Sequence, residues 1–434
     1  MSLETIINAQ GQLVISDVHG KMDTVKKALD YSAANDYALT VNGDIVNDYS
    51  FTNLISQMGY KSPNEIQMEY FSQNLSQNDL QALIIARNTS QYGLDAILGQ
   101  IPENQRKEAQ TQIEEALKHS QTELFQKRVQ KVADNLMEEK GAEMQDNAIK
   151  MRALYDVFMD EEAKRFAQEL NQYDNVKVLF NKGNHENTYF VEQVRQYLDN
   201  KEQIIDLNGH EGYVTLKSKS GLETTMAAMT NSAQMMPYLS EIFQEEELYQ
   251  LYSHMLPDKN KLESMMFGDQ SIEELKQLEE IYSKDKDYQR IKAQNHDKDL
   301  DIFLTHGQVG KPMTNNNRAY DVPYYASAAA LSLESKLTVE GHIHSNYEGK
   351  NSFGVDMIRA AGSNAAIIKK DENGEMQTEW LEIDSEHNGN HSNPIPYSIE
   401  YLEMRVADRV KQYEAMIAQQ NAQNTQTSQS SKAA

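Results

Sequence analysis

Five short motifs in this chain of 434 residues place glycine beside Asp, Asn or His, and each follows a run typical of a buried strand. In chain order they are Asp17-Val18-His19-Gly20, Gly43-Asp44, Gly183-Asn184-His185-Glu186, Thr305-His306-Gly307 and Gly341-His342-Ile343-His344. The motifs contain five of the eleven histidines. Carboxylate, amide and imidazole groups delivered from several strand ends suit divalent cations of intermediate hardness. The ordered set therefore predicts a site for two metal ions.

The first two motifs are expected to lie together because of the elements around them. Residues 12–16 and 38–42 are typical of strands, and the segment between them has helical spacing. In open α/β sheets, ligands bind at the carboxyl ends of the strands. Strand-helix-strand geometry therefore predicts that Asp17, His19 and Asp44 meet at one edge of a sheet.

A long helical insertion is predicted between the second and third motifs. Residues 50–174 show little strand character and are rich in Gln, Glu, Asn and Lys. Apolar residues spaced by threes and fours indicate two long helices, with Gly141 as the turn of a hairpin arm. Strand character returns at residues 176–180, so the arm interrupts one core. A second helical insertion is expected at about residues 235–295.

The predicted organisation is therefore a core in two parts, residues 1–49 and 175–393, with a C-terminal helix over 394–418. Residues 419–434 are mainly Gln, Asn, Ser and Thr, which predicts a disordered tail. Two hairpins are also expected, one around Gly221 and one at Asn373-Gly374.

Composition limits the classes of partner. With 41 basic and 66 acidic residues, the net charge of −25 argues against a general nucleic-acid binder or an anionic-membrane binder. There is no cysteine, so a zinc site would need nitrogen and oxygen ligands. No secretory signal is visible, and no stretch approaches the roughly 18 apolar residues of a membrane span. We therefore expect a soluble, cytoplasmic protein, with export by a signal-less route left open.

With these motifs in this order, the chain resembles the calcineurin-like metallophosphoesterase superfamily, whose pattern is DxH, GDxx(D), GNH(E/D), a later H and GHxH. The resemblance implies an α/β (α+β) fold, a metallophosphoesterase-type β-sandwich flanked by helices, here with large helical insertions. It also implies a dinuclear metal centre. Its ligands would be Asp17, His19 and His344 for one ion, Asn184, His306 and His342 for the other, and Asp44 as the bridge between both.

The chemistry of such a centre follows from the ligand types. Mixed nitrogen and oxygen ligands suit Mn²⁺, Fe²⁺ or Zn²⁺. Two such ions can hold a bridging hydroxide at neutral pH and bind phosphate oxygens. The leaving alkoxide then needs a proton. His185 follows the ligand Asn184 and has no assigned metal, so it is the candidate general acid, and His185 and Asp44 are the predicted catalytic residues.

Two positions depart from the phosphoprotein-phosphatase branch of the superfamily. That branch has an Asp three residues after the bridging Asp, followed by an Arg, whereas Asn47 and Asp48 stand here. Asp48 or Glu186 could replace that Asp in orienting the catalytic histidine. Arg318 and Arg359 are candidates for binding substrate phosphate, although a solvated or ion-paired arginine is the more common role for such a residue. The GHxH ending indicates the prokaryotic-type branch, although Asp-x-His-Gly and Gly-Asn-His-Glu are features of the phosphoprotein branch.

The leading hypothesis is a hydrolase of phosphate esters, more a phosphomonoesterase (including a phosphoprotein phosphatase) than a phosphodiesterase or nucleotide hydrolase. Its partners would be a phosphorylated small molecule or phosphoprotein, with a protein partner on the helical insertion. A hypothesis from another class is a non-catalytic interaction scaffold that kept the fold. A host-directed effector is a third, supported by the arm and the polar tail.

Overall fold

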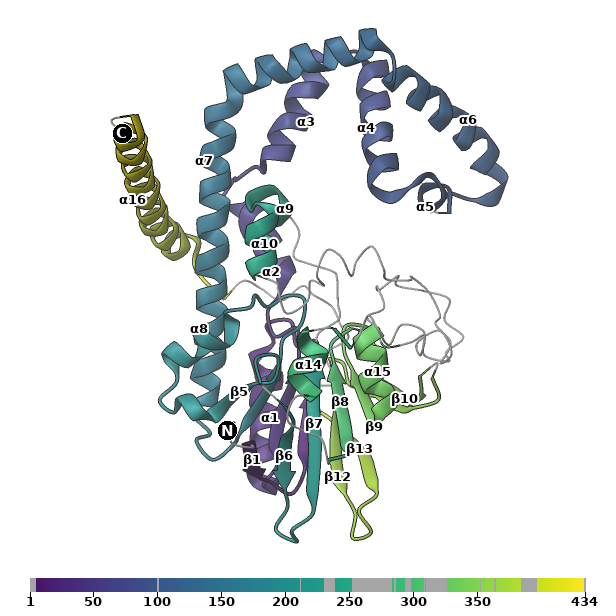
Figure 1. Ribbon diagram of the computed structural model, residues 1–434, viewed down its shortest axis with the longest axis vertical. Coiled ribbons are helices and arrows are strands. Elements are labelled where there is room, and N and C mark those ends of the chain that lie inside the picture. The colour runs from purple at the N-terminus through teal and green to yellow at the C-terminus, as the bar shows by residue number, and fades with distance from the viewer. Residues whose placement is uncertain are drawn as a thin grey trace. The chain divides into compact units, whose positions relative to one another are not determined.

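The computed structural model of the protein describes residues 5–99, 101–210, 212–229, 239–251, 283–284, 286–292, 298–307, 309, 326–351, 353–362, 364–383 and 396–432. The chain divides into two compact units (Figure 1). The first unit comprises Met1–Leu54 and Tyr155–Leu402, and the second comprises Ile55–Leu154 and Glu403–Ala434.

Two β-sheets form the centre of the first unit (Figure 1). The larger sheet contains, in spatial order, β1 (Thr5–Asn8), β6 (Val214–Lys217), β7 (Glu223–Met229), β8 (Leu300–Thr305), β9 (Ser335–Glu340), β11 (Asp356–Arg359) and β10 (Tyr347–Lys350). The smaller sheet contains β13 (Met376–Glu382), β12 (Asn364–Lys370), β2 (Gln12–Ile15), β3 (Ala38–Asn42), β4 (Val178–Asn181) and β5 (Ile204–Asp206).

The two sheets pack face to face through one apolar layer. Val14 and Ala366 of the smaller sheet belong to the same buried cluster as Met226, Ile302 and Leu337 of the larger sheet. Alternation along each strand sends every second side chain into this layer. The burial of apolar surface contributes roughly 25 cal/mol per Å² to folding. The predicted α/β class with a β-sandwich is confirmed.

Helices cover the outer faces of the sandwich. In α15 (Ala326–Glu334), Ala328 and Leu331 pack with Phe303 of β8, whose neighbours Ile302 and Leu304 face the other sheet. On the smaller sheet, α1 (Met22–Asn35) contacts β2 and β3. The buried residues of α1 recur by threes and fours, as expected of a helix with one apolar face. The sandwich is therefore flanked by helices, as predicted.

Parallel pairing aligns the strands that precede the five motifs. Strands β2, β3 and β4 are mutually parallel neighbours in the smaller sheet, and β8 and β9 are parallel neighbours in the larger sheet. Their carboxyl ends therefore meet at one edge of the sandwich. Both predicted hairpins are present, β6 with β7 and β12 with β13, and their turn glycines Gly221 and Gly374 have φ values of 87° and 82°.

One long helix replaces the predicted hairpin arm. α7 runs from Glu123 to Leu170 and passes through Gly141 without a break. A single glycine costs a helix only about 1 kcal/mol, and its neighbours in this helix are strong helix formers. Residues 155–170 belong to the first unit, where Tyr155, Phe158 and Phe166 are buried. The insertion was predicted to extend to residue 174, whereas the first unit already resumes at Tyr155.

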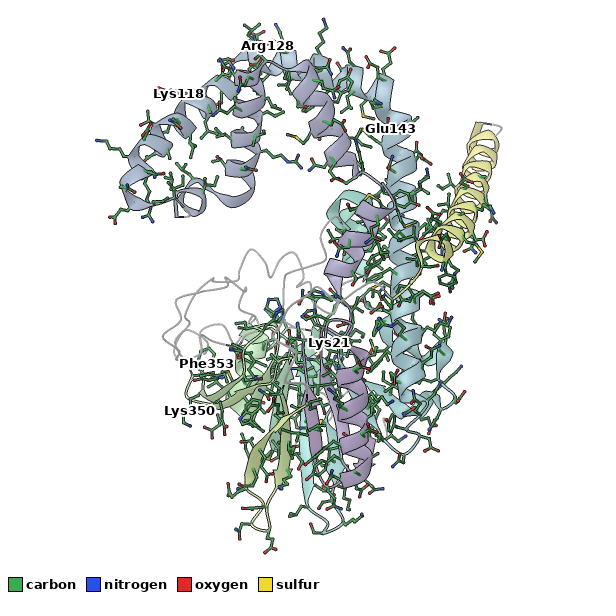
Figure 2. All side chains as sticks on the ribbon, turned by 180° about the vertical axis from the view of Figure 1, so that it is seen from behind. Lys21, Lys118, Arg128, Glu143, Lys350 and Phe353 are labelled. Atoms are coloured by element: carbon green, nitrogen blue, oxygen red, sulfur yellow. The ribbon has the colours of Figure 1, made fainter. Side chains whose placement is uncertain are left out.

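The second unit is helical in its described part. Its elements are α3 (Pro63–Asn74), α4 (Gln77–Tyr92), α5 (Leu94–Gly99), α6 (Glu103–Ser120), residues 123–154 of α7 and residues 403–432 of α16 (Ile399–Lys432), while α2 (Asp48–Gln57) spans the boundary. Ser62 and Glu65 form a capping box at the start of α3. Arg128, labelled in Figure 2, donates two hydrogen bonds to Asp79 of α4 and holds the pKa of that carboxyl down at about 2.

The remaining helices test two further expectations. Within the second predicted insertion lie α9 (Leu239–Ile242), α10 (Glu245–Leu251) and α14 (Lys286–Lys292), and residues 252–282 lie outside the described residues. The C-terminal helix α16 runs from Ile399 to Lys432, so residues predicted as a disordered tail are helical here. This stretch has no Gly or Pro to end a helix. Among the described residues, no helix is both long and apolar enough to cross a bilayer.

The first unit should fold without the second. Phe51 of α2 lies with its ring centroid 5.7 Å from that of Tyr155, so a short Gly-rich linker can replace residues 55–154. We expect this chain, ended at Leu402, to unfold in one cooperative thermal transition with a native near-UV circular dichroism spectrum. The matched control removes residues 50–174 instead. It should fail to fold, because it loses the buried face of α7. Equal behaviour of the two chains would contradict the unit boundary.

Candidate metal centre

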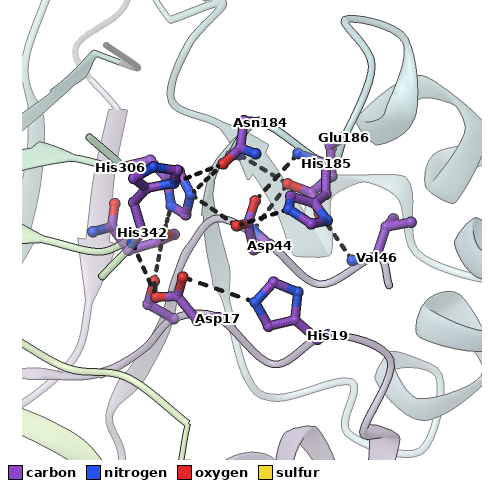
Figure 3. A network of polar contacts seen from close by, with 12 residues as sticks. Asp17, His19, Asp44, Val46, Asn184, His185, Glu186, His306 and His342 are labelled. Atoms are coloured by element: carbon purple, nitrogen blue, oxygen red, sulfur yellow. Dashed lines mark hydrogen bonds and ion pairs between the residues drawn. The ribbon is translucent and has the colours of Figure 1, made fainter. Parts of the chain in front are cut away.

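The five motifs converge at the shared edge of the two sheets (Figure 3). Asp17, Asp44 and Asn184 follow β2, β3 and β4 of the smaller sheet, while His306 and His342 follow β8 and β9 of the larger sheet. Each side chain comes from a different strand end. The sandwich thus brings together residues more than 300 positions apart in the sequence, as the contact between His19 and His344 shows.

A first donor group consists of Asp17, His19 and His344. The Nε2 atoms of His19 and His344 lie 2.9 Å apart. Asp17 Oδ1 is 3.5 Å from His344 Nε2 and 4.0 Å from His19 Nε2. Asp17 and His19 are buried, whereas His344 is about one third exposed, with 30% of its side-chain surface accessible. Three ligand atoms therefore face one common point near the surface.

A second donor group consists of Asp44, Asn184, His306 and His342. Asn184 Oδ1 lies 3.0 Å from His306 Nε2 and 3.0 Å from His342 Nδ1. Asp44 Oδ2 lies 3.0 Å from the same nitrogen of His306. The group therefore presents a carboxylate, an amide oxygen and two imidazoles, linked in a row by contacts of 3.0 Å.

Both groups fit a metal ion. Bonds of about 2.0–2.1 Å place adjacent ligand atoms of an octahedral or tetrahedral shell roughly 2.8–3.4 Å apart. Most of the spacings within the two groups are close to these values. Donor atoms of Asp17, His19 and His344 lie within 4.8 Å of one another, as do those of Asp44, His306 and His342. The clustered side chains could therefore bind metal ions.

Burial and mutual charge set the protonation of these groups. Burial favours the neutral form of Asp44, but the imidazoles of His185 and His306 outweigh it and hold its pKa well below the usual range. Burial acts against the charged form of His306, yet Asp44 outweighs it and raises the pKa to about 10. Burial lowers the pKa of His342 to about 4 and that of His19 well below its usual value. Burial also acts against the charged form of His344, yet the carboxylate of Asp17 outweighs it and raises the pKa of His344 as well. A cation that binds His306 or His344 would therefore compete with a proton.

Backbone strain is concentrated at the candidate ligands. Asp17, His19, Asp44 and His342 have φ values of 56°, 47°, 57° and 65°, in the left-handed region. Among the described residues, the other non-glycine residue with positive φ is Asp36, which caps α1. Such conformations cost about 1–3 kcal/mol each and gather at functional sites. These conformations lower the stability of the fold, and they orient the side chains of the candidate ligands toward one another.

The glycines of the motifs allow the strand-end loops to approach closely. A Cβ atom on Gly43 would lie against the ring of His306, and one on Gly183 would lie against the carboxylate of Asp44. A Cβ atom on Gly341 would also meet the ring of His306. Glycine therefore stands beside the ligands because the loops meet at backbone distance, and the sequence pattern of the motifs has a steric cause.

His185 lies against both donor groups. Its Nε2 atom is 3.6 Å from Asp44 Oδ2, and its ring centroid is 4.9 Å from that of His19. The side chain is only 9% exposed. Its donor atom also groups with those of His19 and Asp44 within 4.8 Å. The geometry thus accommodates His185 either as a proton donor to substrate or as a further ligand.

Glu186 has a structural role that the sequence analysis missed. Its carboxylate accepts hydrogen bonds from the backbone N–H groups of Asp44 at 3.0 Å, Val46 at 2.9 Å and Gly183 at 2.8 Å (Figure 3). It is fully buried. These bonds join two ligand loops and use both carboxylate oxygens. The position of Glu186 directly after Gly183-Asn184-His185 was the only hint of this role in the sequence. The role itself could not be predicted, because two of the N–H groups that it binds belong to Asp44 and Val46, far away in the chain.

The remaining candidates divide into two kinds. Arg318 lies outside the described residues, as does the side chain of Asp48, the first residue of α2. Arg359 is 2% exposed and donates a hydrogen bond of 3.0 Å to the carboxylate of Glu340. Glu340 also accepts from the backbone N–H of Val309 at 2.9 Å. Arg359 is therefore a buried, ion-paired arginine beside the strand that leads into the histidine motif, which is the more common of the two roles expected for it.

Comparison with known proteins adds distant structural similarity. No protein-family model and no curated protein matches the sequence. Among solved structures, the chain is similar to the 5'-nucleotidase from Candida albicans SC5314, at 9% sequence identity and a TM-score of 0.31. The similarity covers 95% of this chain and 59% of that chain, less than two thirds of its length. The function of the site therefore has to be judged from its own geometry.

Gly43→Ala tests the steric role of the motif glycines. Gly43 and Gly221 have nearly equal φ values of 88° and 87°, but a Cβ on Gly221 meets nothing within 4 Å. Both alanine variants should lose about 1–2 kcal/mol of unfolding free energy from left-handed strain. Gly43→Ala should lose more, and its bound metal as well, because the ring of His306 must move. Denaturant unfolding and elemental analysis provide the measurements. Equal losses would contradict the close-approach argument.

Proposed function

We propose that the protein is a metal-dependent phosphoesterase with two divalent ions in this centre. The observation that carries the proposal is the pair of donor groups, one beside the other, with Asp44 near both. When bound, two such ions would supply an activated water as nucleophile and neutralise the charge on a phosphate group. Binding of metal ions would also explain why five strand ends converge on a buried cluster of polar side chains with strained backbone conformations.

The side chains divide the work of binding. The first donor group would hold one ion and the second donor group the other. Asp44 would bridge them, since its donor atoms lie close to His306 in one direction and to His19 and His185 in the other. The chain has no cysteine, and these imidazole and oxygen donors suit Mn²⁺, Fe²⁺ or Zn²⁺.

His185 is proposed to protonate the leaving oxygen of the substrate. It stands at the edge of both donor groups and is mostly shielded from solvent. A proton donor there could reach an oxygen departing from phosphate without passing through bulk water. Its Nε2 atom lies 3.6 Å from Asp44 Oδ2, so the imidazole faces the carboxylate proposed to bridge the two ions.

The proposed substrate is a phosphate monoester, either a small molecule or a phosphoprotein. Parallel assays on a chromogenic monoester, a chromogenic diester and phosphopeptides would rank these classes. A phosphodiesterase would favour the second substrate. A protein that binds metal but hydrolyses none of the three would instead be an interaction scaffold that kept the fold.

Asp44→Asn should reduce the affinity for both ions, because one carboxylate serves both donor groups. Elemental analysis of protein purified without chelator should find about two divalent ions per chain in the wild type, as expected of a two-metal site, and far fewer in the variant. Asp301→Asn is the matched control, since Asp301 is a buried carboxylate paired with Lys336 and Lys370 outside the site. It should lower stability and keep the metal content. A metal-replete Asp44→Asn protein would refute the bridging role.

His185→Ala should keep both ions and lose rate in a way that depends on the leaving group. A general acid contributes about 10²–10⁴-fold, and only where the departing oxygen is basic. Hydrolysis of an alkyl phosphate should therefore fall much more than that of a nitrophenyl phosphate. Steady-state kinetics on the two esters, with metal content measured in parallel, test this. Equal losses would argue for a positioning role, and loss of metal would identify His185 as a ligand.

A further inference from the structure

A chain of buried amide hydrogen bonds runs one step behind the candidate ligands. Asn208 Nδ2 donates to Asn181 Oδ1 at 2.9 Å, and Asn181 Nδ2 donates to Asn42 Oδ1 at 2.7 Å. Asn42 Nδ2 then donates to the backbone oxygen of Thr305 at 3.0 Å. Asn42 and Asn181 are fully buried, and Asn208 is half-buried. We call Asn42, Asn181 and Asn208 the asparagine ladder.

The ladder joins the two sheets where the ligand loops begin. Asn42 and Asn181 are paired residues at the ends of the parallel strands β3 and β4, whereas Thr305 ends β8 of the other sheet. Asn42 directly precedes Gly43, Asn181 lies two residues before Gly183, and Thr305 directly precedes His306. Asn208 also accepts from the backbone N–H of Lys182, directly before Gly183, at 2.6 Å. The ladder thus contacts the loops of three motifs.

Amides at these positions are chemically unexpected. Strands buried on both faces normally carry continuous apolar side chains, and the other residues of β3 and β4 are buried. A buried amide that lacks its partners costs about 1–3 kcal/mol. Valine or leucine would avoid this cost. Three amides in one hydrogen-bonded chain therefore indicate a requirement other than core packing.

Asn42 acts on His306 in two ways. Its side chain binds the backbone oxygen of Thr305, the residue before His306. Its own backbone oxygen accepts a hydrogen bond of 2.8 Å from His306 Nδ1. A proton on Nδ1 leaves Nε2 to face Asp44 and Asn184, and such support commonly fixes the tautomer and orientation of a metal-binding imidazole.

We propose that the asparagine ladder is a positioning device for the second donor group, which sets the affinity of that group for its cation through His306. The proposal rests on the proposed metal centre. A purely structural role, in which the amides only hold the two sheets together, would lower stability without distinguishing one donor group from the other. Selectivity between the two donor groups is therefore the decisive readout.

The test is to titrate the metal-stripped full-length chain with Mn²⁺ and to measure binding by isothermal titration calorimetry. Loss of a supporting partner behind a ligand typically weakens metal binding about 10–100-fold. We expect Asn42→Leu to weaken one of two Mn²⁺ sites by this factor and to spare the other. In a His342→Ala background, which removes a ligand of the second donor group, Asn42→Leu should not change the affinity for the remaining ion.

Two further variants keep the test decisive. Thr40 lies in β3, two residues before Asn42, and its hydroxyl donates a buried hydrogen bond to Gln12 of β2. Thr40→Val removes this bond, so it should lower the melting temperature and leave both Mn²⁺ affinities unchanged. Asn208→Ala changes the half-buried end of the ladder, so it tests the proposal even if Asn42→Leu fails to fold. It should give a smaller loss at the same site.

Three results would overturn the proposal. The first is unchanged Mn²⁺ affinity in both ladder variants that fold. The second is an equal weakening of both sites. The third is a site-selective loss in Thr40→Val as large as that in Asn42→Leu. A wild-type chain that binds no Mn²⁺ would overturn the metal centre itself together with the ladder, whereas normal wild-type binding with unaffected variants overturns the ladder alone.

Discussion

The buried carboxylate of Asp44 is the group on which the rest of the site depends. Placing this charge in the interior would be costly without compensation. The imidazole of His306 at 3.0 Å and that of His185 at 3.6 Å supply opposite charge when protonated. The backbone N–H of His185 also donates to Asp44 at 3.2 Å. Each of these partners lies on another loop, so satisfying one carboxylate requires the loops after β3, β4 and β8 to meet.

That meeting determines the local backbone. Loops that converge on one carboxylate leave no room for Cβ atoms where they touch, which accounts for Gly43, Gly183 and Gly341. The same convergence forces several ligands into left-handed conformations that cost about 1–3 kcal/mol each. Glu186 and the asparagine ladder oppose this cost by tying the loops to one another through buried hydrogen bonds. Strain at the ligands and support behind them are two aspects of one arrangement.

The negative charge of the whole chain affects how a phosphate ester could approach the site. A net charge of −25 repels phosphate esters at long range. If the protein is the proposed phosphoesterase, attraction of its substrate would have to come from cations bound in the centre, over distances shorter than the Debye length of about 8–10 Å in physiological salt. Binding of a phosphate ester would then depend on the metal-loaded centre more than on the surface of the protein.

The sequence by itself determined the chemistry and the class of fold. Ligand types, their order and the glycines beside them are local features, and so are the turn residues Gly221 and Asn373-Gly374, because a positive φ selects glycine wherever it occurs. Parallel strands with motifs at their ends follow from hydrophobic patterning and from the connection rules of α/β folds. The two-sheet sandwich and the proposed grouping of the ligands came instead from the resemblance of the ordered motifs to the metallophosphoesterase superfamily.

Only the tertiary structure decided how particular residues are used. Periodicity cannot tell which core a helix joins, so the helix through Gly141 and the burial of Tyr155 in the first unit depended on packing. The sequence alone does not name the partner of Arg359, and only the packed structure brings it to the carboxylate of Glu340. The asparagines at the ends of β3 and β4 have no pattern of their own in the sequence. Their meaning comes from partners in other strands, because hydrogen bonds between distant segments exist only once the two sheets have packed.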